Sequence, residues 1–179
     1  MRTDTLGPLD PLMSRQVVVM GVSGCGKSTI GRSIAALAGW SFAEGDDYHP
    51  AANVATMAAG TPLTDEDRWP WLRSLAAWMR AEAVAGRASV VTCSALKREY
   101  RDLLGEGLPG LQFVHLHGSW DLLLARMQAR SDHFMPASLL QSQFDTLEAL
   151  QPGEAGIVLD IAADPDTLVG QALHWLARR

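Results

Sequence analysis

Five short segments rich in apolar residues are spaced along the chain. Segments of this length predict β-strands. The segment at residues 88–94 is apolar without alternation, which is typical of a parallel strand covered on both faces. The predicted strands are residues 16–20, 40–44, 88–94, 111–117 and 157–161.

Between these segments, apolar residues recur at helical spacing. Thr64 and the acidic residues after it resemble a capped helix start, and Pro136 suits the first turn of another helix. The predicted helices are residues 29–37, 51–59, 65–85, 96–104, 120–130, 136–150 and 165–177. Because strands that alternate with helices form parallel sheets, we expect an α/β protein with helices on both faces of a five-stranded parallel sheet.

The sequence GVSGCGKS at residues 21–28 matches the P-loop pattern between a predicted strand and a predicted helix. Glycines let successive N–H groups turn toward an anion, and the next helix adds its positive dipole end. Lys27 would bring its charge to the terminal phosphates of ATP, and Ser28 would offer its hydroxyl to Mg²⁺. The predicted ATP-binding residues are Gly21, Val22, Ser23, Gly24, Cys25, Gly26, Lys27, Ser28 and Thr29.

Other motifs choose among the classes of P-loop protein. The N-K-x-D motif by which GTPases read guanine is absent from the sequence. Motor ATPases place an aspartate after a buried strand beside the P-loop strand, and the strand at 88–94 ends without one. Asp160 does follow an apolar strand, but that strand is the last and is expected to lie to one side. We therefore expect Asp160 near the base pocket rather than on the metal.

Polar side chains follow the second predicted strand, at the edge of the sheet where ligands bind in α/β proteins. Asp46 could accept the proton of a substrate hydroxyl and align that hydroxyl with the γ-phosphate, or else cap a helix or lie near the metal. Asp47 is expected to be structural. His49, before Pro50, is a candidate substrate contact, with a hydrogen bond to the main chain as the alternative.

Two arginines precede a polar break at residues 131–136. Arg126 and Arg130 are four positions apart on one helix face, as in a lid that presents cations to a transferring phosphoryl group. The alternative is solvation at the surface. We count Arg130 with Lys27 and Asp46 as catalytic, and Arg126 as a second phosphate contact. Arg101 is expected to be an exposed helix charge.

Composition limits the other possibilities. A chain of 179 residues suits one domain, with residues 1–15 as a loose extension. The net charge of −5 argues against nucleic-acid binding. No apolar run is long enough to span a bilayer, so no membrane association is expected. The two cysteines, Cys25 and Cys93, do not suggest a disulfide, which favours the cytoplasm.

Several longer stretches resemble one family of small kinases. They are GDDYHP at residues 45–50, TDEDRWPWL at 64–72, CSALK at 93–97, HFMP at 133–136 and QFDTLE at 143–148. With the P-loop, these stretches are similar to those of the gluconokinases, which are related to shikimate kinases and adenylate kinases. The resemblance spans nearly the whole chain after the extension.

The resemblance implies phosphorylation of D-gluconate at its 6-hydroxyl by ATP with Mg²⁺, giving 6-phospho-D-gluconate, and a homodimer. It also implies a P-loop fold like that of nucleoside monophosphate kinases at residues 16–179, with a substrate-binding insertion at about residues 46–86 and a lid at about 126–138. The implied substrate-binding residues are Asp46, His49, Arg68 and Lys97. Lys97 and Arg98 both follow the third predicted strand, so one of them could reach the carboxylate of gluconate or the phosphate.

Arg68 lies where related kinases place a cation for the substrate carboxylate, with pairing to Asp65 or Glu66 as the alternative. The chain departs from its relatives at Ser131-Asp132, where they commonly carry a glycine at the second position, and an acid beside a triphosphate weakens the argument for a lid.

Two alternatives remain open: a related kinase that acts on shikimate, a nucleoside monophosphate or another sugar acid, and an ATP-binding regulator without catalysis. Asp46 and Arg130 favour an enzyme. Cys25 lies in the P-loop, so its alkylation should block ATP binding.

Overall fold

The computed structural model describes residues 15–130 and 136–179. The strands are β1 (Gln16–Met20), β2 (Ser41–Ala43), β3 (Ser89–Thr92), β4 (Gln112–His117) and β5 (Gly156–Asp160). The helices are α1 (Lys27–Ala38), the short 3-10 helix η1 (Gly45–Tyr48), α2 (Ala51–Ala58), α3 (Asp65–Val84), α4 (Arg98–Gly105), α5 (Trp120–Gln128), α6 (Ala137–Thr146) and α7 (Pro165–Leu176). The elements alternate along the chain as the apolar pattern predicts.

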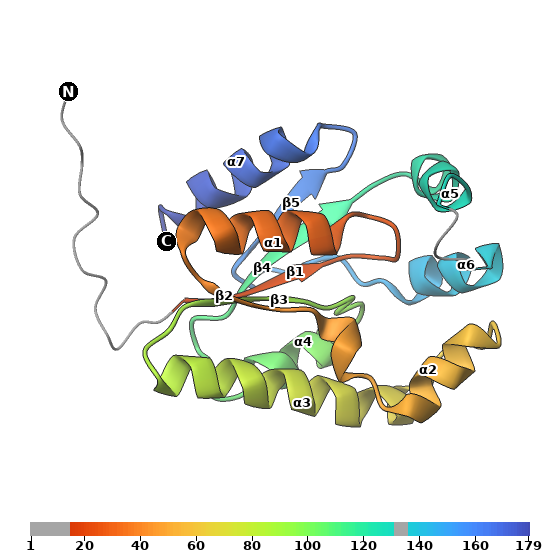
Figure 1. The fold of residues 1–179 in the computed structure, drawn as a ribbon, viewed down its shortest axis with the longest axis horizontal. Helices are drawn as coiled ribbons and strands as arrows, with labels where there is room; N and C mark the ends of the chain where they lie inside the picture. Colours follow the sequence, from red (N-terminus) through yellow and green to blue (C-terminus); the bar gives the residue numbers. More distant parts are fainter. Residues whose placement is uncertain (1–14, 131–135) are drawn as a thin grey trace.

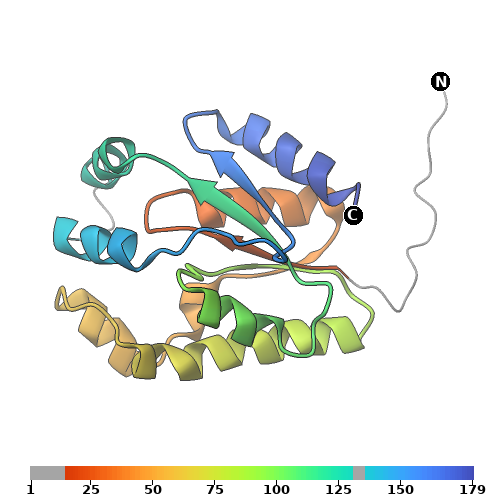
Figure 2. The same ribbon diagram turned by 180° about the vertical axis from the view of Figure 1, so that it is seen from behind.

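The five strands form one parallel sheet in the order β2-β3-β1-β4-β5. Helices α1 and α7 cover one face of the sheet, and α3 and α4 cover the other, while α2, α5 and α6 lie beyond one end of it (Figures 1 and 2). Strand β1 is central and fully buried, which explains its continuous run of valines. The predicted fold class is therefore confirmed.

The position of β5 bears on the role of Asp160. Strand β4 separates β5 from β1, so Asp160 ends an edge strand that is not a neighbour of the P-loop strand. This agrees with the expectation that Asp160 does not take the place of a motor ATPase aspartate. Within the described residues, no helix has both the length and the apolar character needed to cross a bilayer.

Helix α6 ends earlier than the sequence pattern predicts. Its last residue is Thr146, and Leu147 has an extended conformation with φ −62° and ψ 121°. Leu147 and Leu150 still pack against the core, but from the loop that leads to β5. Apolar residues that pack from an irregular segment can continue a helical spacing by coincidence, which is why the pattern overestimated this helix.

The expectation that Arg101 is exposed is wrong. Its side chain is 0% exposed, and its Nε lies 2.6 Å from Oε1 of Glu154. The guanidinium also donates to four main-chain carbonyls, those of Ala95, Leu96, Glu148 and Ala149. Arg101 therefore joins the loop after β3 to the loop before β5. Its partners Glu148, Ala149 and Glu154 lie far along the chain, so its neighbours on helix α4 gave no sign of this role.

Candidate active site

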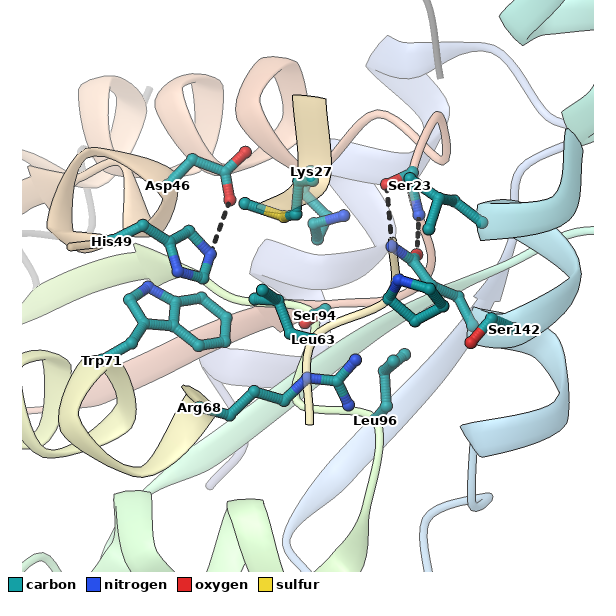
Figure 3. A pocket seen from close by; sticks show the side chains of 14 residues that line it. Ser23, Lys27, Asp46, His49, Leu63, Arg68, Trp71, Ser94, Leu96 and Ser142 are labelled. Carbon is teal, nitrogen blue, oxygen red and sulfur yellow. Dashed lines mark hydrogen bonds and ion pairs between the residues drawn. The ribbon is translucent and has the colours of Figure 1, made fainter. Parts of the chain in front are cut away.

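An open cavity lies where the carboxyl ends of the central strands meet the helices beyond them. Figure 3 shows Lys27, Asp46 and Arg68 around this cavity, contributed by α1, η1 and α3. The residues that line it are Ser23, Lys27, Asp46, His49, Met57, Pro62, Leu63, Arg68, Trp71, Ser94, Leu96, Leu139, Ser142 and Gln143. The fold thus brings the P-loop and the predicted substrate insertion to one site.

The P-loop connects β1 to α1 with a backbone path that requires glycine. Gly21 has a φ of 143°, and a Cβ atom there would lie 2.6 Å from the carbonyl oxygen of Leu116. Gly26, with a φ of 95°, is the N-cap of α1 and has no side chain to occupy the first N–H groups of the helix. These N–H groups and the helix dipole suit a phosphate, so the loop fits ATP.

Lys27 lies over the P-loop and lines the cavity. Its Nζ donates to the main-chain carbonyls of Gly21 and Val22, both at 3.1 Å. Ser28 and Thr29 are exposed in the first turn of α1, so their hydroxyls are accessible. Mg²⁺ bound with a nucleotide keeps several waters and needs few protein ligands, and a single hydroxyl such as that of Ser28 fits this chemistry.

The two cysteines are buried and free, in agreement with the expectation of no disulfide. Cys25 is 1% exposed, so a thiol reagent cannot reach it while the P-loop keeps this conformation. The prediction that alkylation of Cys25 blocks ATP binding therefore needs a movement of the P-loop that exposes the thiol. Burial raises the pKa of Cys93 to about 12, which keeps that thiol protonated at neutral pH.

Gln143 is a contact to the P-loop that sequence reasoning missed. Its Oε1 accepts a hydrogen bond of 2.7 Å from the main-chain N–H of Ser23, and its Nε2 donates to Oγ of Ser23 at 3.2 Å. Both bonds are drawn in Figure 3. Helix α6 is thereby attached to the ATP side of the cavity. The only signal in the sequence was the resemblance around residues 143–148, which assigned no role to the glutamine.

Asp46 and His49, two of the predicted substrate contacts, line the cavity on and just after η1. The Asp46 side chain is 82% exposed, while that of His49 is 4% exposed, and 3.9 Å separates Oδ1 of Asp46 from Nε2 of His49. His49 stacks on Trp71 with ring centroids 4.1 Å apart. Burial lowers the pKa of His49; the charge of Asp46 opposes this change and that of Arg68 adds to it.

Arg68 faces the cavity, whereas Lys97 does not line it. Arg68 donates from Nη1 to the Tyr100 hydroxyl at 2.9 Å. The Tyr100 hydroxyl in turn donates to Asp65, and Nζ of Lys97 lies 3.0 Å from each Asp65 oxygen. The hydrogen bond from Tyr100, followed by that from Lys97, lowers the pKa of Asp65. Asp65 is thus paired with Lys97 and Tyr100, while Arg68 remains directed at the cavity.

Arg126 and Arg130, the predicted phosphate contacts, do not line this cavity. They do not share a helix as predicted, because α5 ends at Gln128. Arg126 donates from Nη2 to the main-chain carbonyl of Ile161 at 2.7 Å, which joins α5 to the end of β5. Arg130 is exposed just after α5. The predicted lid at about residues 126–138 includes residues 131–135, which lie outside the described residues, and with them Asp132 and His133. The phosphate-binding roles of both arginines stay predictions.

The chain is similar to known kinases in both sequence and structure. A family profile described as shikimate kinase matches residues 23–152. A gluconokinase from Gluconobacter oxydans is 48% identical, over 91% of this chain and 92% of its own. The crystal structure of a sugar kinase from Janibacter sp. superposes with a TM-score of 0.88 at 58% identity, covering 92% of this chain and 95% of the other. A gluconokinase from Sinorhizobium meliloti gives a TM-score of 0.85 at 47% identity, covering 93% of both chains.

Proposed function

The chain belongs to the gluconokinase family, and from this premise we propose that it transfers the γ-phosphoryl group of ATP to the 6-hydroxyl of D-gluconate. The products are 6-phospho-D-gluconate and ADP. The proposal rests on the observation that Lys27, Asp46 and Arg68 line one cavity. There they would supply a phosphate contact, a base and a contact to the substrate carboxylate, respectively.

The ATP side of the site consists of the P-loop and the start of α1. The main-chain N–H groups of the loop and Lys27 would hold the phosphates, and the hydroxyl of Ser28 would ligate Mg²⁺. When bound, ATP supplies the phosphoryl group, and Mg²⁺ offsets the charge of its phosphates. These residues position the phosphates and stabilise negative charge, which are the main tasks of a kinase site.

The substrate side consists of η1 and the first turns of α3. Arg68 would bind the gluconate carboxylate, because a guanidinium can bond both oxygens of a carboxylate at once. The oxygen of the 6-hydroxyl would attack the γ-phosphorus while the bond from that phosphorus to the leaving ADP oxygen breaks. Asp46 would accept the proton that the hydroxyl loses. A carboxylate-binding arginine at one end and a base at the other would select an acyclic polyhydroxy acid.

A coupled assay of ADP release tests this proposal against its alternatives. D-gluconate should stimulate ADP release more strongly than idonate, shikimate or AMP at millimolar concentration. A preference for one of the other compounds would assign a different kinase activity. Binding of ATP without turnover on any sugar acid would favour the regulator.

Three further features belong to the same proposal. Residues 16–179 would form one kinase domain, with a substrate insertion at about residues 46–86 and with Arg126 and Arg130 beside a lid. The family resemblance supports a homodimer, which light scattering after size-exclusion chromatography would test. ATP, the proposed phosphoryl donor, is abundant in the cytoplasm, and we place the enzyme there.

A further inference from the structure

The side-chain amide of Asn53, on α2 next to His49, has a fixed orientation. Asn53 is 5% exposed, and its Nδ2 donates to the main-chain carbonyl of Asp67 at 2.9 Å. A carbonyl oxygen only accepts hydrogen bonds, so the atom that faces it must be the amide nitrogen. The second hydrogen of this nitrogen is available to the other neighbour of Asn53, which is His49.

The orientation of Asn53 determines the tautomer of His49. Nδ2 of Asn53 lies 3.4 Å from Nδ1 of His49. An amide NH₂ group cannot accept a hydrogen bond from a ring N–H, so Nδ1 must be the unprotonated acceptor. Burial lowers the pKa of His49, which keeps the ring neutral near pH 7. A neutral ring with an unprotonated Nδ1 carries its hydrogen on Nε2.

The Nε2–H group is held in place and faces Asp46. The His49 ring stacks on Trp71 with an interplanar angle of 18°. Trp71 is itself anchored, since its Nε1 donates to the carbonyl of Gly45 at 2.8 Å. Figure 3 shows the imidazole between Trp71 and Asp46, with a dashed line from Nε2 to the carboxylate. The imidazole is therefore the fixed partner of this pair.

Asp46 is the movable partner. Its side chain is 82% exposed, and the 3.9 Å from Oδ1 to Nε2 is longer than a hydrogen bond. Rotation of an exposed carboxylate can close such a gap, and catalytic hydrogen bonds are often long before the substrate binds. Without a fixed donor, an exposed carboxylate would sample several rotamers and present its lone pairs in several directions.

We infer that His49 is a positioning residue for Asp46, and that Asn53 sets the tautomer His49 needs for this task. In this arrangement Nε2–H donates to Oδ1, and Oδ2 is left to accept the proton of the substrate hydroxyl. The inference rests on the proposed function, since it takes Asp46 as the base. It replaces the sequence-based interpretation of His49 as a direct substrate contact.

The tautomer can be measured without any assay of activity. Long-range ¹H–¹⁵N correlation spectra distinguish the two neutral tautomers, and the chain has five histidines, so loss of one set of signals in His49→Gln assigns His49. At pH 7.5 the wild type should show the Nε2–H form. Asn53→Ala should shift the ring toward the Nδ1–H form, with the fold checked by circular dichroism. An Nδ1–H ring in the wild type, or no change in Asn53→Ala, would overturn the inference.

The contact between His49 and Asp46 has a second readout in the same spectra. Because the Asp46 carboxylate raises the pKa of His49, Asp46→Asn should lower it. Asp47→Asn is the matched control, since Asp47 is the neighbouring exposed carboxylate, and it should change this pKa less. Equal shifts in the two variants would count against a specific contact.

Kinetics separate a positioning role from a substrate contact. A Gln side chain can place an amide N–H near the position of Nε2, whereas Asn places one nearer to Nδ1. We expect His49→Gln to retain most of kcat, and His49→Asn to lose about 10- to 100-fold in kcat with little change in the KM for gluconate. A rise in KM with kcat unchanged would make His49 a substrate contact instead. If the wild type does not phosphorylate gluconate at all, the proposed function fails, while the two spectroscopic results still decide the hydrogen-bond arrangement.

Discussion

Arg68 presents a guanidinium to the cavity, and Asp65, three residues before it on α3, is engaged elsewhere. Asp65 is bonded to Lys97 and Tyr100, and Arg68 is bonded to the neutral Tyr100 hydroxyl. A cation with no carboxylate partner of its own in these contacts is suited to bind the carboxylate of a substrate. Lys97 differs in that it is paired with Asp65, although the sequence suggested both cations as substrate contacts.

This difference predicts a large change in the KM for gluconate when Arg68 is replaced and a small one when Lys97 is replaced. Arg68→Lys keeps the charge but loses the planar fork, so the KM for gluconate should rise about 10- to 100-fold, in line with about 1.5–3 kcal/mol for a hydrogen bond to a charged group. The KM for ATP should change little. Lys97→Gln is the control and should change the KM for gluconate less than about threefold, because Lys97 does not line the cavity and Asp65 keeps its hydrogen bond from Tyr100. Steady-state kinetics with both substrates varied would measure this, and the reverse order of effects would assign the carboxylate to Lys97.

At the scale of elements, helix α6 and the P-loop form one unit through Gln143. Two hydrogen bonds hold Ser23, which lines the ATP side of the cavity. Gln143→Leu should raise the KM for ATP about 3- to 10-fold, because each such bond contributes about 0.5–1.5 kcal/mol. Gln141→Leu is the control on the same helix, where the exposed amide bonds only Asp145 among the contacts described for it. A fall in the KM for ATP in Gln143→Leu would mean that Gln143 competes with the phosphates.

The loops after β3 and before β5 form a second such unit, which Arg101 holds together. Arg101→Met removes one partner of a buried ion pair. It leaves several carbonyls without this donor, and Glu154 keeps its hydrogen bond from the main-chain N–H of Gln151. Losses of this kind cost about 3–5 kcal/mol in the free energy of unfolding. Arg98→Met, on the same helix, loses a more exposed pair with Asp102 and a longer one, of 3.8 Å, with Glu154, and should cost less than about 1 kcal/mol. Urea unfolding would measure both changes in the free energy of unfolding. Similar losses in the two variants would contradict the role of Arg101 in holding the two loops together.

The sequence was informative where a pattern is local and less so where partners are distant. Helical and strand spacing predicted the five strands and their helices, and the P-loop motif lies between β1 and α1 as its pattern requires. The contacts of Arg101 with Glu154 and of Gln143 with Ser23 join segments far apart in the sequence. Such contacts depend on the tertiary fold, and no spacing rule along the chain reports them.

At the scale of the whole molecule, the core contains a histidine that should make stability depend on pH. His115 on β4 is 4% exposed, and within residues 15–130 and 136–179 neither ring nitrogen has a hydrogen-bond partner. Burial, followed by the charges of His117 and Arg101, lowers its pKa to about 4 from an ordinary 6.5. The unfolded chain therefore binds the additional proton between these two values, and protonation favours unfolding.

The free energy of unfolding should accordingly fall as the pH drops from about 6.5 to about 4, by up to about 3 kcal/mol from this group. His115→Leu should remove this part of the pH dependence, whereas His174→Leu, at an exposed position on α7, should keep it. Urea unfolding at pH 7 and pH 5 would measure the effect. Equal losses of unfolding free energy between pH 7 and pH 5 in the wild type and in His115→Leu would show that other groups determine the loss of stability at low pH.

Phosphorylation of D-gluconate on its 6-hydroxyl can be tested by the position of the new phosphate in the product. The protein is incubated with ATP, Mg²⁺ and D-gluconate, and the product is examined by ³¹P–¹H correlation spectroscopy. We predict one phosphomonoester whose phosphorus couples to the two protons on C6, formed in equal amount with ADP. Lys27→Ala is the control and should form it at least about 100-fold more slowly. Coupling to a proton on another carbon, or ADP formed at the same rate without gluconate, would contradict the account.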